Sequence, residues 1–153
     1  RHGWYWNPRM QRVILPVKKD GKVIYWQGRG FDPGRPKAIN PGANREGLVA
    51  KYGDGDWVAL TEDILSAAKV GSVGEAWALL GTVLSYSIAR ALADAGRPVL
   101  LMLDDDPAGR RGAAEASKTL NLLGVWNKQV YFGKDPKGVD RSTIKAKAKE
   151  LLP

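Results

Sequence analysis

Three consecutive carboxylates follow an apolar run and are the residues of this chain best suited to chemistry. The run is residues 99–103, Val-Leu-Leu-Met-Leu, and the acids are Asp104, Asp105 and Asp106. A short apolar run predicts a buried strand, and in an extended chain Asp104 and Asp106 leave on the same face. Converging carboxylates repel each other unless a cation lies between them, and Mg²⁺ prefers such oxygen ligands. The stretch therefore predicts a divalent metal site.

Two further acidic residues follow other predicted strands. Glu62 comes after residues 57–61, and Asp135 comes after residues 128–132. The carboxyl ends of parallel strands meet at one edge of a sheet, which is where open α/β sheets bind ligands. Each acid alone is also typical of a helix cap or a loop. The four together, Glu62, Asp104, Asp106 and Asp135, favour a metal site at that edge.

The elements that must position these acids alternate between strand and helix from residue 56 onward. The predicted strands are residues 57–61, 75–80, 98–103 and 128–132. The predicted helices are a stretch ending near residue 68, residues 85–95, residues 107–123 and a last helix from about residue 141. Strands separated by helices imply a mostly parallel sheet with right-handed crossovers. We therefore expect an α/β fold, with a sheet of about four strands flanked by helices.

Residues 1–55 have a different pattern, which predicts a small, basic, β-rich subdomain. The β-rich runs 12–17 and 22–27 are joined by a segment containing Asp20-Gly21, a strong hairpin signal. Residues 28–42 are dense in glycine and proline and carry several cations. Cations on turns among glycines can meet phosphates closely, although a solvated basic loop has the same composition. We place the boundary with a second domain, residues 56–153, after residue 55.

An aromatic cluster, Trp4, Tyr5 and Trp6, lies near the start of the chain among polar residues. Aromatic side chains in such a cluster can stack on bases or can pack against their own domain. We favour a packing anchor over a base-stacking platform.

The composition favours a polyanionic partner. The 153 residues contain 24 Lys and Arg against 16 Asp and Glu, which gives a net charge of +8. A basic surface of this size favours nucleic acid, although charge alone is weak evidence. The chain has no cysteine and one histidine, His2, which argues against thiolate chemistry and against a histidine-based dyad. No apolar run approaches the length of a membrane span, and the start at Arg1 suggests a piece of a longer protein.

Several nucleotide-site motifs are a poor match. The acidic strand resembles that of a P-loop NTPase, but the sequence holds no G-x-x-x-x-G-K-[ST]. An aspartate-nucleophile phosphatase would carry its Asp-x-Asp near the start of the fold, whereas Asp104 comes after two strand-helix units. A receiver domain would need an acidic pair after its first strand, which Glu62-Asp63 matches poorly.

The chain resembles the TOPRIM family, which is shared by primases, topoisomerases and some nucleases. The signature is a glutamate after the first strand, here Glu62, and an Asp-x-Asp after the third, here Asp104-Asp105-Asp106. The resemblance is closest to the RNA polymerase domain of bacterial and phage primases. Segments similar to that domain are Leu80-Gly81-Thr82, Asp106-Pro107-Ala108-Gly109-Arg110, Gly133-Lys134-Asp135-Pro136 and, upstream, Gly28-Arg29 with Pro36-Lys37-Ala38-Ile39-Asn40.

Three positions depart from the family pattern. Asp63 stands where the family usually has glycine, and Ser66 stands where it usually has aspartate. Lys137 stands where a further acidic residue is usual after Asp-Pro. Asp63 could supply the missing negative charge, and the departures leave the metal count open.

The resemblance implies a DNA primase catalytic core that makes short RNA primers on single-stranded DNA from NTPs. It implies Glu62, Asp104 and Asp106 as catalytic residues, and the same three with Asp135 as ligands of Mg²⁺ or Mn²⁺, expected as two ions. The implied nucleotide- and DNA-binding residues are Arg29, Lys37, Asn40, Arg45, Arg110 and Lys134. The implied setting is the replication fork in the cytoplasm of a bacterial or phage-infected cell. A replicative helicase and a zinc-binding domain, both outside this chain, are the implied partners.

Three alternatives remain open from the sequence. A TOPRIM nuclease would use the same acids with water as the nucleophile. A non-catalytic nucleic-acid-binding module would keep the basic loops without depending on the acids. An inert α/β scaffold would use the acids as helix caps only. A topoisomerase is disfavoured because it needs a tyrosine nucleophile on a separate domain.

Overall fold

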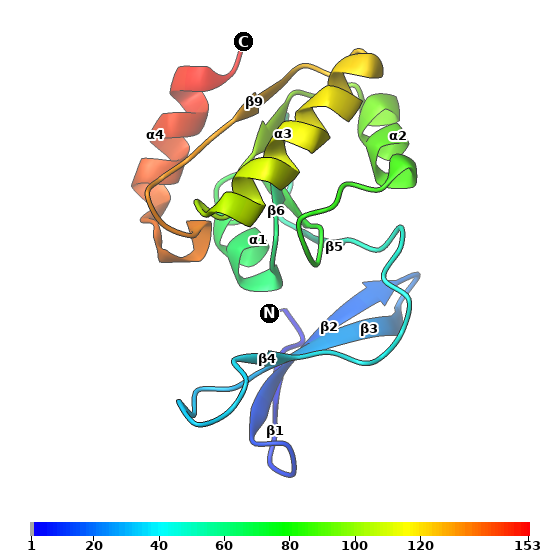
Figure 1. Cartoon of the computed structure of the whole chain (residues 1–153), viewed down its shortest axis with the longest axis vertical. Coiled ribbons are helices and arrows are strands. Elements are labelled where there is room, and N and C mark those ends of the chain that lie inside the picture. Colours follow the sequence, from blue (N-terminus) through cyan, green and yellow to red (C-terminus); the bar gives the residue numbers. More distant parts are fainter. Residues whose placement is uncertain (1) are drawn as a thin grey trace. The chain divides into compact units, whose positions relative to one another are not determined.

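The computed structural model describes residues 2–153 and divides into two compact units (Figure 1). The first unit ends at Arg45, and the second runs from Glu46 to Pro153. This division comes earlier in the chain than the expected boundary after residue 55. The reason is strand β5 (Ala50–Tyr52), which pairs antiparallel with a strand of the second unit.

The first unit is a four-stranded antiparallel sheet in the order β1-β2-β3-β4. Its strands are β1 (Tyr5–Asn7), β2 (Arg12–Lys19), β3 (Lys22–Arg29) and β4 (Ala38–Ile39). The predicted hairpin is confirmed as β2 and β3. Asp20 and Gly21 join these strands with φ values of 51° and 77°, the two positive values that a type I′ turn requires.

The preferred interpretation of the aromatic cluster is wrong for two of its three residues. Tyr5 and Trp6 lie on the outer strand β1 and are 55% and 53% exposed, whereas Trp4 is half-buried. Their side chains therefore do not anchor the packing of the first unit. The strand was not expected, because three residues are too few to show an alternating pattern.

The second unit contains a five-stranded sheet in the order β5-β7-β6-β8-β9. The four strands β6 (Val58–Thr61), β7 (Glu75–Ala78), β8 (Val99–Leu101) and β9 (Asn127–Gln129) are parallel, as expected, and β5 is the antiparallel edge. The helices are α1 (Ile64–Val70), α2 (Tyr86–Ala95), α3 (Pro107–Leu122) and α4 (Arg141–Leu151), with a 3₁₀ turn η1 (Pro136–Gly138) before α4.

The helices cover both faces of this sheet. All four residues of β6 are buried, and alternate side chains of the strand lie on opposite faces. On one face, Val58 and Leu60 join a core that includes Ile88 of α2 and Leu120 of α3. Helices α1 and α4 pack against each other, and α2 packs against α3 (Figure 1). A parallel sheet covered in this way presents only its strand ends to ligands. None of the helices in residues 2–153 is both long and apolar enough to cross a membrane.

Candidate functional site

Glu62 and Asp104 follow the two neighbouring strands in the middle of the sheet. Glu62 comes directly after β6, and Asp104 comes three residues after β8 ends at Leu101. From β6 the chain first adds β7 on one side and then crosses to add β8 on the other side. The carboxyl ends of β6 and β8 therefore form the topological switch point, the position at which open α/β sheets bind ligands.

A hydrogen bond joins the two acidic residues. The backbone N–H of Asp104 donates to Oε1 of Glu62 over 3.1 Å. Gly109 of α3 lies against both residues, because a Cβ at this position would fall 2.1 Å from the carbonyl oxygen of Asp104 and 2.7 Å from Glu62 Oε1. Only a glycine permits this approach of helix α3, which explains the glycine in the Asp-Pro-Ala-Gly-Arg segment.

Both carboxyl groups resist ionisation. Burial, and to a smaller extent the charge of Asp104, raises the pKa of Glu62 from 4.5 to about 7. The hydrogen bond from the Asp104 N–H acts in the opposite direction and lowers this pKa. Burial also raises the pKa of Asp104 from 3.8 to about 6. The charge of Lys137 opposes this rise, and nearby acids including Asp135 add to it. Two half-buried acids that share one edge are poised to bind a proton or a metal cation.

The other two acids of the triplet have structural partners. Asp106 caps α3, with Oδ1 accepting from the backbone N–H of Gly109 over 2.7 Å. Asp105 accepts from the backbone N–H of Gly133 over 3.0 Å and from Nε of Arg110 over 2.7 Å. The guanidinium of Arg110 also lies over the ring of Tyr131, 4.3 Å from its centroid. Asp105 thus ties the start of α3 to the loop after β9. In Asp106, the cap uses Oδ1, so the second carboxylate oxygen takes no part in it.

Asp135 and Asp63 face a lysine at the same edge. Nζ of Lys137 donates to Asp135 Oδ2 over 2.7 Å and to Asp63 Oδ2 over 2.8 Å. Asp63 also caps α1, with Oδ1 accepting from the backbone N–H of Ser66 over 2.9 Å. Two of the three departures from the family pattern, Asp63 and Lys137, therefore contact each other, and the third, Ser66, supplies the capped N–H.

The four expected metal ligands differ in whether the fold already gives their carboxylates a partner. Within residues 2–153, no three acidic or histidine side chains are gathered into a ready-made metal site, since Asp135 faces Lys137 and Asp106 caps a helix. Asp104 Oδ1, however, is buried and accepts no hydrogen bond. A buried carboxylate oxygen without a donor is unfavourable unless a cation completes it. The Glu62–Asp104 end of the edge is therefore the part that fits a divalent cation.

The Leu80-Gly81-Thr82 segment wraps around the end of β6. The Gly81 N–H donates to the Glu62 carbonyl over 3.1 Å, and the Leu79 N–H donates to Thr61 over 2.8 Å. Leu80 has a φ of 59°, a left-handed conformation that is rare for a bulky residue. Backbone strain of this kind concentrates at functional sites. Through the Gly81–Glu62 hydrogen bond, this segment, which follows β7, fixes the backbone of Glu62.

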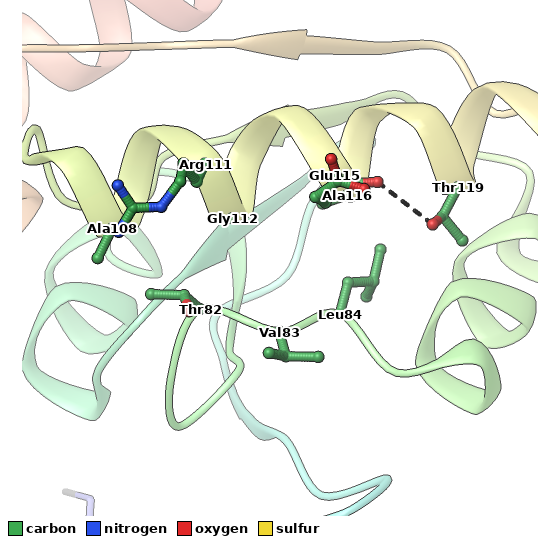
Figure 2. Close-up of a pocket in the computed structure, with 9 residues that line it drawn as sticks. All are labelled: Thr82, Val83, Leu84, Ala108, Arg111, Gly112, Glu115, Ala116 and Thr119. Atoms are coloured by element: carbon green, nitrogen blue, oxygen red, sulfur yellow. Dashed lines mark hydrogen bonds between the residues drawn. The ribbon is translucent and has the colours of Figure 1, made fainter.

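A pocket of about 350 Å³ lies between this segment and helix α3 (Figure 2). Thr82, Val83 and Leu84 face α3 across the pocket, and Arg111 lies on the helix side (Figure 2). The remaining lining residues are Ala108, Gly112, Glu115, Ala116 and Thr119. The volume is within the range of small-molecule sites. The pocket adjoins the acidic edge, because Thr82 follows the glycine bonded to Glu62 and Ala108 lies in the first turn capped by Asp106.

Three of the four predicted phosphate-binding residues of the first unit, Arg29, Lys37 and Asn40, lie at the β3–β4 ribbon of its sheet. Arg29 and Ala38 are paired across β3 and β4, and the Gly30 N–H donates to the Lys37 carbonyl over 3.0 Å. The side chain of Gln27 donates to Asn40 Oδ1 over 3.4 Å. Lys37, Asn40 and Arg45 are exposed, and Arg29 is half-buried. The ribbon therefore presents Arg29, Lys37 and Asn40 close together.

The structure gives the two remaining predicted basic residues different surroundings. Arg110 is held by Asp105 and Tyr131, so its guanidinium has a structural role in the second unit. Lys134 is exposed on the loop before η1. Both stay predictions as nucleotide-binding residues.

Sequence reasoning missed the surroundings of two cationic residues, Lys137 and Arg12. Lys137 was noted only as a departure, because its contact with Asp63 spans 74 residues. Arg12 was not considered, yet it is 5% exposed and its guanidinium lies 2.7 Å from where a Cβ of Gly30 would stand. The Gly28-Arg29-Gly30 segment was the available signal, because a glycine between cations often permits a close approach.

The second unit has the fold of a Toprim domain. The Toprim-like family model matches residues 61–140, which is more than half of the chain, and the chain belongs to this family. Its parallel sheet and the acids after β6 and β8 are the features predicted from the TOPRIM resemblance, which is confirmed. Toprim domains are generally metal-dependent.

The similar proteins are DNA primases. A DNA primase of Clostridium acetobutylicum is 32% identical over 141 residues, covering 82% of this chain and 24% of that protein. A DNA primase of Aquifex aeolicus is 30% identical over 166 residues, covering 98% of this chain and 33% of that protein. The crystal structure of the zinc-binding and RNA polymerase domains of the Aquifex aeolicus primase matches with a TM-score of 0.71 and 26% identity, covering 92% of this chain and 39% of that one. The chain spans a third or less of the curated relatives it matches.

Proposed function

We propose that this chain is the catalytic core of a DNA primase, which makes short RNA primers from NTPs on single-stranded DNA with Mg²⁺ or Mn²⁺. The observation that carries the proposal is the Glu62–Asp104 pair at the switch point of a Toprim-like sheet, with one buried Asp104 oxygen that accepts no hydrogen bond. The relatives named DNA primase support the choice of reaction over other Toprim chemistry.

The acids have distinct roles in this proposal. Asp104 and Asp106 hold the divalent cation, with Asp135 at the rim of the same edge. A cation bound there would neutralise charge at the α-phosphate of the incoming NTP, activate the attacking 3′-hydroxyl and stabilise the pyrophosphate that leaves. Glu62 receives the proton of that hydroxyl, because its pKa of about 7 suits a base that works near neutral pH. Its hydrogen bond from the Asp104 N–H fixes the carboxylate orientation.

The basic residues bind the polyanionic substrates. Arg29 and Lys37, together with Asn40 and Arg45, contact phosphates of the template or the NTP, with Lys134 as a further contact from the second unit. Arg110 acts through Asp105 by positioning the start of α3. The setting is the replication fork of a bacterial or phage-infected cell, where a helicase and a zinc-binding domain are the partners.

A primer-synthesis assay tests this function. Labelled ribonucleotides and single-stranded DNA are incubated with Mg²⁺, with Mn²⁺ or with chelator, for the wild type and for Asp104→Asn. Asp94→Asn, which changes an exposed carboxylate on α2, is the matched control. We expect short RNA products only with metal, in the wild type and the control but not in Asp104→Asn.

Other outcomes would contradict the proposal in distinguishable ways. Primer synthesis that survives Asp104→Asn combined with Asp106→Asn would remove the acids from the reaction. Metal-dependent shortening of the DNA without RNA products would establish a nuclease. Retained DNA binding with no metal-dependent product would leave either a core that needs domains outside this chain or a non-catalytic module, which a longer protein would distinguish.

A further inference from the structure

Lys137 is tethered between two carboxylates at the acidic edge. Its Nζ lies 2.8 Å from Asp63 Oδ2 and 2.7 Å from Asp135 Oδ2. The lysine side chain is 29% exposed and that of Asp63 is 16% exposed. Turn η1, which carries Lys137, packs against α1, which Asp63 caps. The ammonium therefore has a defined position rather than a solvated one.

This ion pair differs from the short-range pairs on the helix surfaces. Arg90–Asp94, Lys118–Glu115 and Lys147–Glu150 each join residues three or four apart on one helix. Exposed pairs of that kind contribute little. The Lys137–Asp63 pair instead joins segments 74 residues apart and brings a positive charge to the strand ends. Its position thus follows from the fold of the site rather than from local helix chemistry.

The positive charge of Lys137 reaches the proposed metal ligands. It favours the ionised form of Asp104, whereas the charges of Asp135, Asp63 and Asp106 oppose that form. Burial lowers the pKa of Lys137 itself, but hydrogen bonds to Asp135 and Asp63 outweigh burial and raise it. The lysine therefore stays protonated beside Asp104 at neutral pH.

A tethered ammonium and a bound metal ion compete for the same carboxylates. The Lys137 Nζ engages one oxygen of Asp63 and one of Asp135, two of the acids whose charges oppose ionisation of Asp104. A divalent cation between Asp63 and Asp135 would have to displace the ammonium, and one elsewhere at the edge would be repelled by it. At the Glu62–Asp104 end, where an oxygen accepts no hydrogen bond, a cation would not have to displace the ammonium.

We propose that Lys137 is a built-in cation that replaces a metal ion at the Asp63–Asp135 end, so that this chain binds one divalent ion rather than the expected two. The inference rests on the proposed function only in placing a metal ion on Asp104, at the end of the edge that also carries Glu62. Lys137 is a positioning residue in this account, because it acts on the metal through the carboxylates. Removal of its charge should open the second end to a metal.

Counting of bound Mn²⁺ tests this role without reference to catalysis. Free Mn²⁺ is measured by electron paramagnetic resonance during titration of the metal-free chain at pH 7.5. We compare the wild type, Lys137→Met, Asp104→Asn and the control Lys149→Met, which removes the same charge from the exposed face of α4. We expect one ion for the wild type and the control. Lys137→Met should bind a second ion or bind the first at least about tenfold more tightly.

A double variant guards against loss of folding. Lys137→Met leaves Asp63 and Asp135 facing each other, which destabilises the metal-free chain. Asp63→Asn combined with Lys137→Met removes this repulsion, and asparagine is as good a helix N-cap as aspartate. We expect the double variant to regain thermal stability without metal and to lose the extra Mn²⁺ binding. Thermal unfolding by circular dichroism measures the stability.

Failure of this inference and failure of the proposed function look different. Two ions on the wild type, or unchanged binding in Lys137→Met while Asp104→Asn loses the ion, would overturn the role of Lys137 alone. No bound Mn²⁺ in the wild type and in Lys137→Met would overturn the metal site and the built-in cation together. If Mn²⁺ binding increased as much in the Lys149→Met control as in Lys137→Met, the increase would reflect the lower net charge of the protein. That result would also overturn the inference.

Discussion

The backbone N–H of Asp104 donates to the Glu62 carboxylate across two neighbouring parallel strands. This bond sets the relative position of the two acids before any ligand binds. It also depends on helix α3, because Gly109 lies against the Asp104 carbonyl and against Glu62 Oε1. The strand ends and the first turn of α3 therefore form one packed unit.

Gly109→Ala should destabilise the chain although alanine is the better helix former. Helix propensity alone predicts a gain of about 1 kcal/mol. The added Cβ would fall 2.1 Å from a backbone oxygen, so we expect instead a loss of about 3 kcal/mol, the upper end for overpacked positions. Urea unfolding measures the change, with Gly42→Ala as the control because its Cβ would meet nothing within 4 Å. A more stable Gly109→Ala variant would contradict the close approach.

Metal-free stability should fall as pH rises from about 4 to about 7. The folded-state pKa values of Glu62 and Asp104, about 7 and about 6, lie above their ordinary values. Over this interval the folded chain holds more protons than the unfolded chain, so the free energy of unfolding decreases with pH. Thermal unfolding in chelator measures this slope, which should be shallower in Glu62→Gln. Mg²⁺ should raise the melting temperature at pH 8 far more than at pH 5, because only the ionised acids bind it. An equal slope in the wild type and Glu62→Gln would contradict the assigned cause.

The sequence was sufficient to predict the parallel sheet, because each of its central strands is a distinct apolar run. Strand β6, whose four residues are all buried, is an example. The starts of helices α2 and α3 were also predictable, because Ser85 and Asp106 are favourable N-cap residues. Strand β7 ends earlier than expected, at Ala78, because Leu80 turns into a left-handed conformation. The apolar content of residues 75–80 indicates burial but does not show where the chain leaves the ladder.

Short strands and long-range contacts could not be predicted. Strand β5 has three residues, too few for periodicity, and its pairing with β7 moves the boundary between the units. Within the site, Glu62 lies beside Asp104 because the strands before them, β6 and β8, are parallel neighbours. The order of the acidic motifs along the chain indicates this arrangement. The pairing of Lys137 with Asp63 depends on how η1 packs on α1, which a local pattern does not contain.

Lys37→Ala should weaken binding to single-stranded DNA and reduce its salt dependence. Lys37 is exposed on the ribbon that also carries Arg29, and each phosphate contact on single-stranded DNA contributes about 0.7 to the slope of log affinity against log salt. We expect the slope to fall by about 0.7 when this contact is removed. Fluorescence anisotropy at several salt concentrations measures it. The control Lys149→Ala removes an exposed lysine from α4 and should leave the slope unchanged; equal slopes in all three proteins would remove Lys37 from the interface.

Substitutions of Asp106 should separate its role as a helix cap from its role as a metal ligand. Its Oδ1 caps α3 through the Gly109 N–H over 2.7 Å, and asparagine can accept the same bond. Asp106→Asn should therefore leave the free energy of unfolding within about 0.5 kcal/mol of the wild type, whereas Asp106→Ala should lower it by about 1 kcal/mol. Urea unfolding measures both changes.

Primer synthesis should be lost in both Asp106 variants, because neither side chain is a carboxylate that can bind the metal ion. Asp140→Ala is the matched control, since Asp140 precedes α4 without a side-chain cap bond, and it should change neither stability nor synthesis appreciably. Full primer synthesis in Asp106→Asn would assign this aspartate to the helix cap alone. Loss of synthesis with an intact cap would show that the second carboxylate oxygen does the chemistry, since the amide keeps every hydrogen bond that the folded chain requires of this residue.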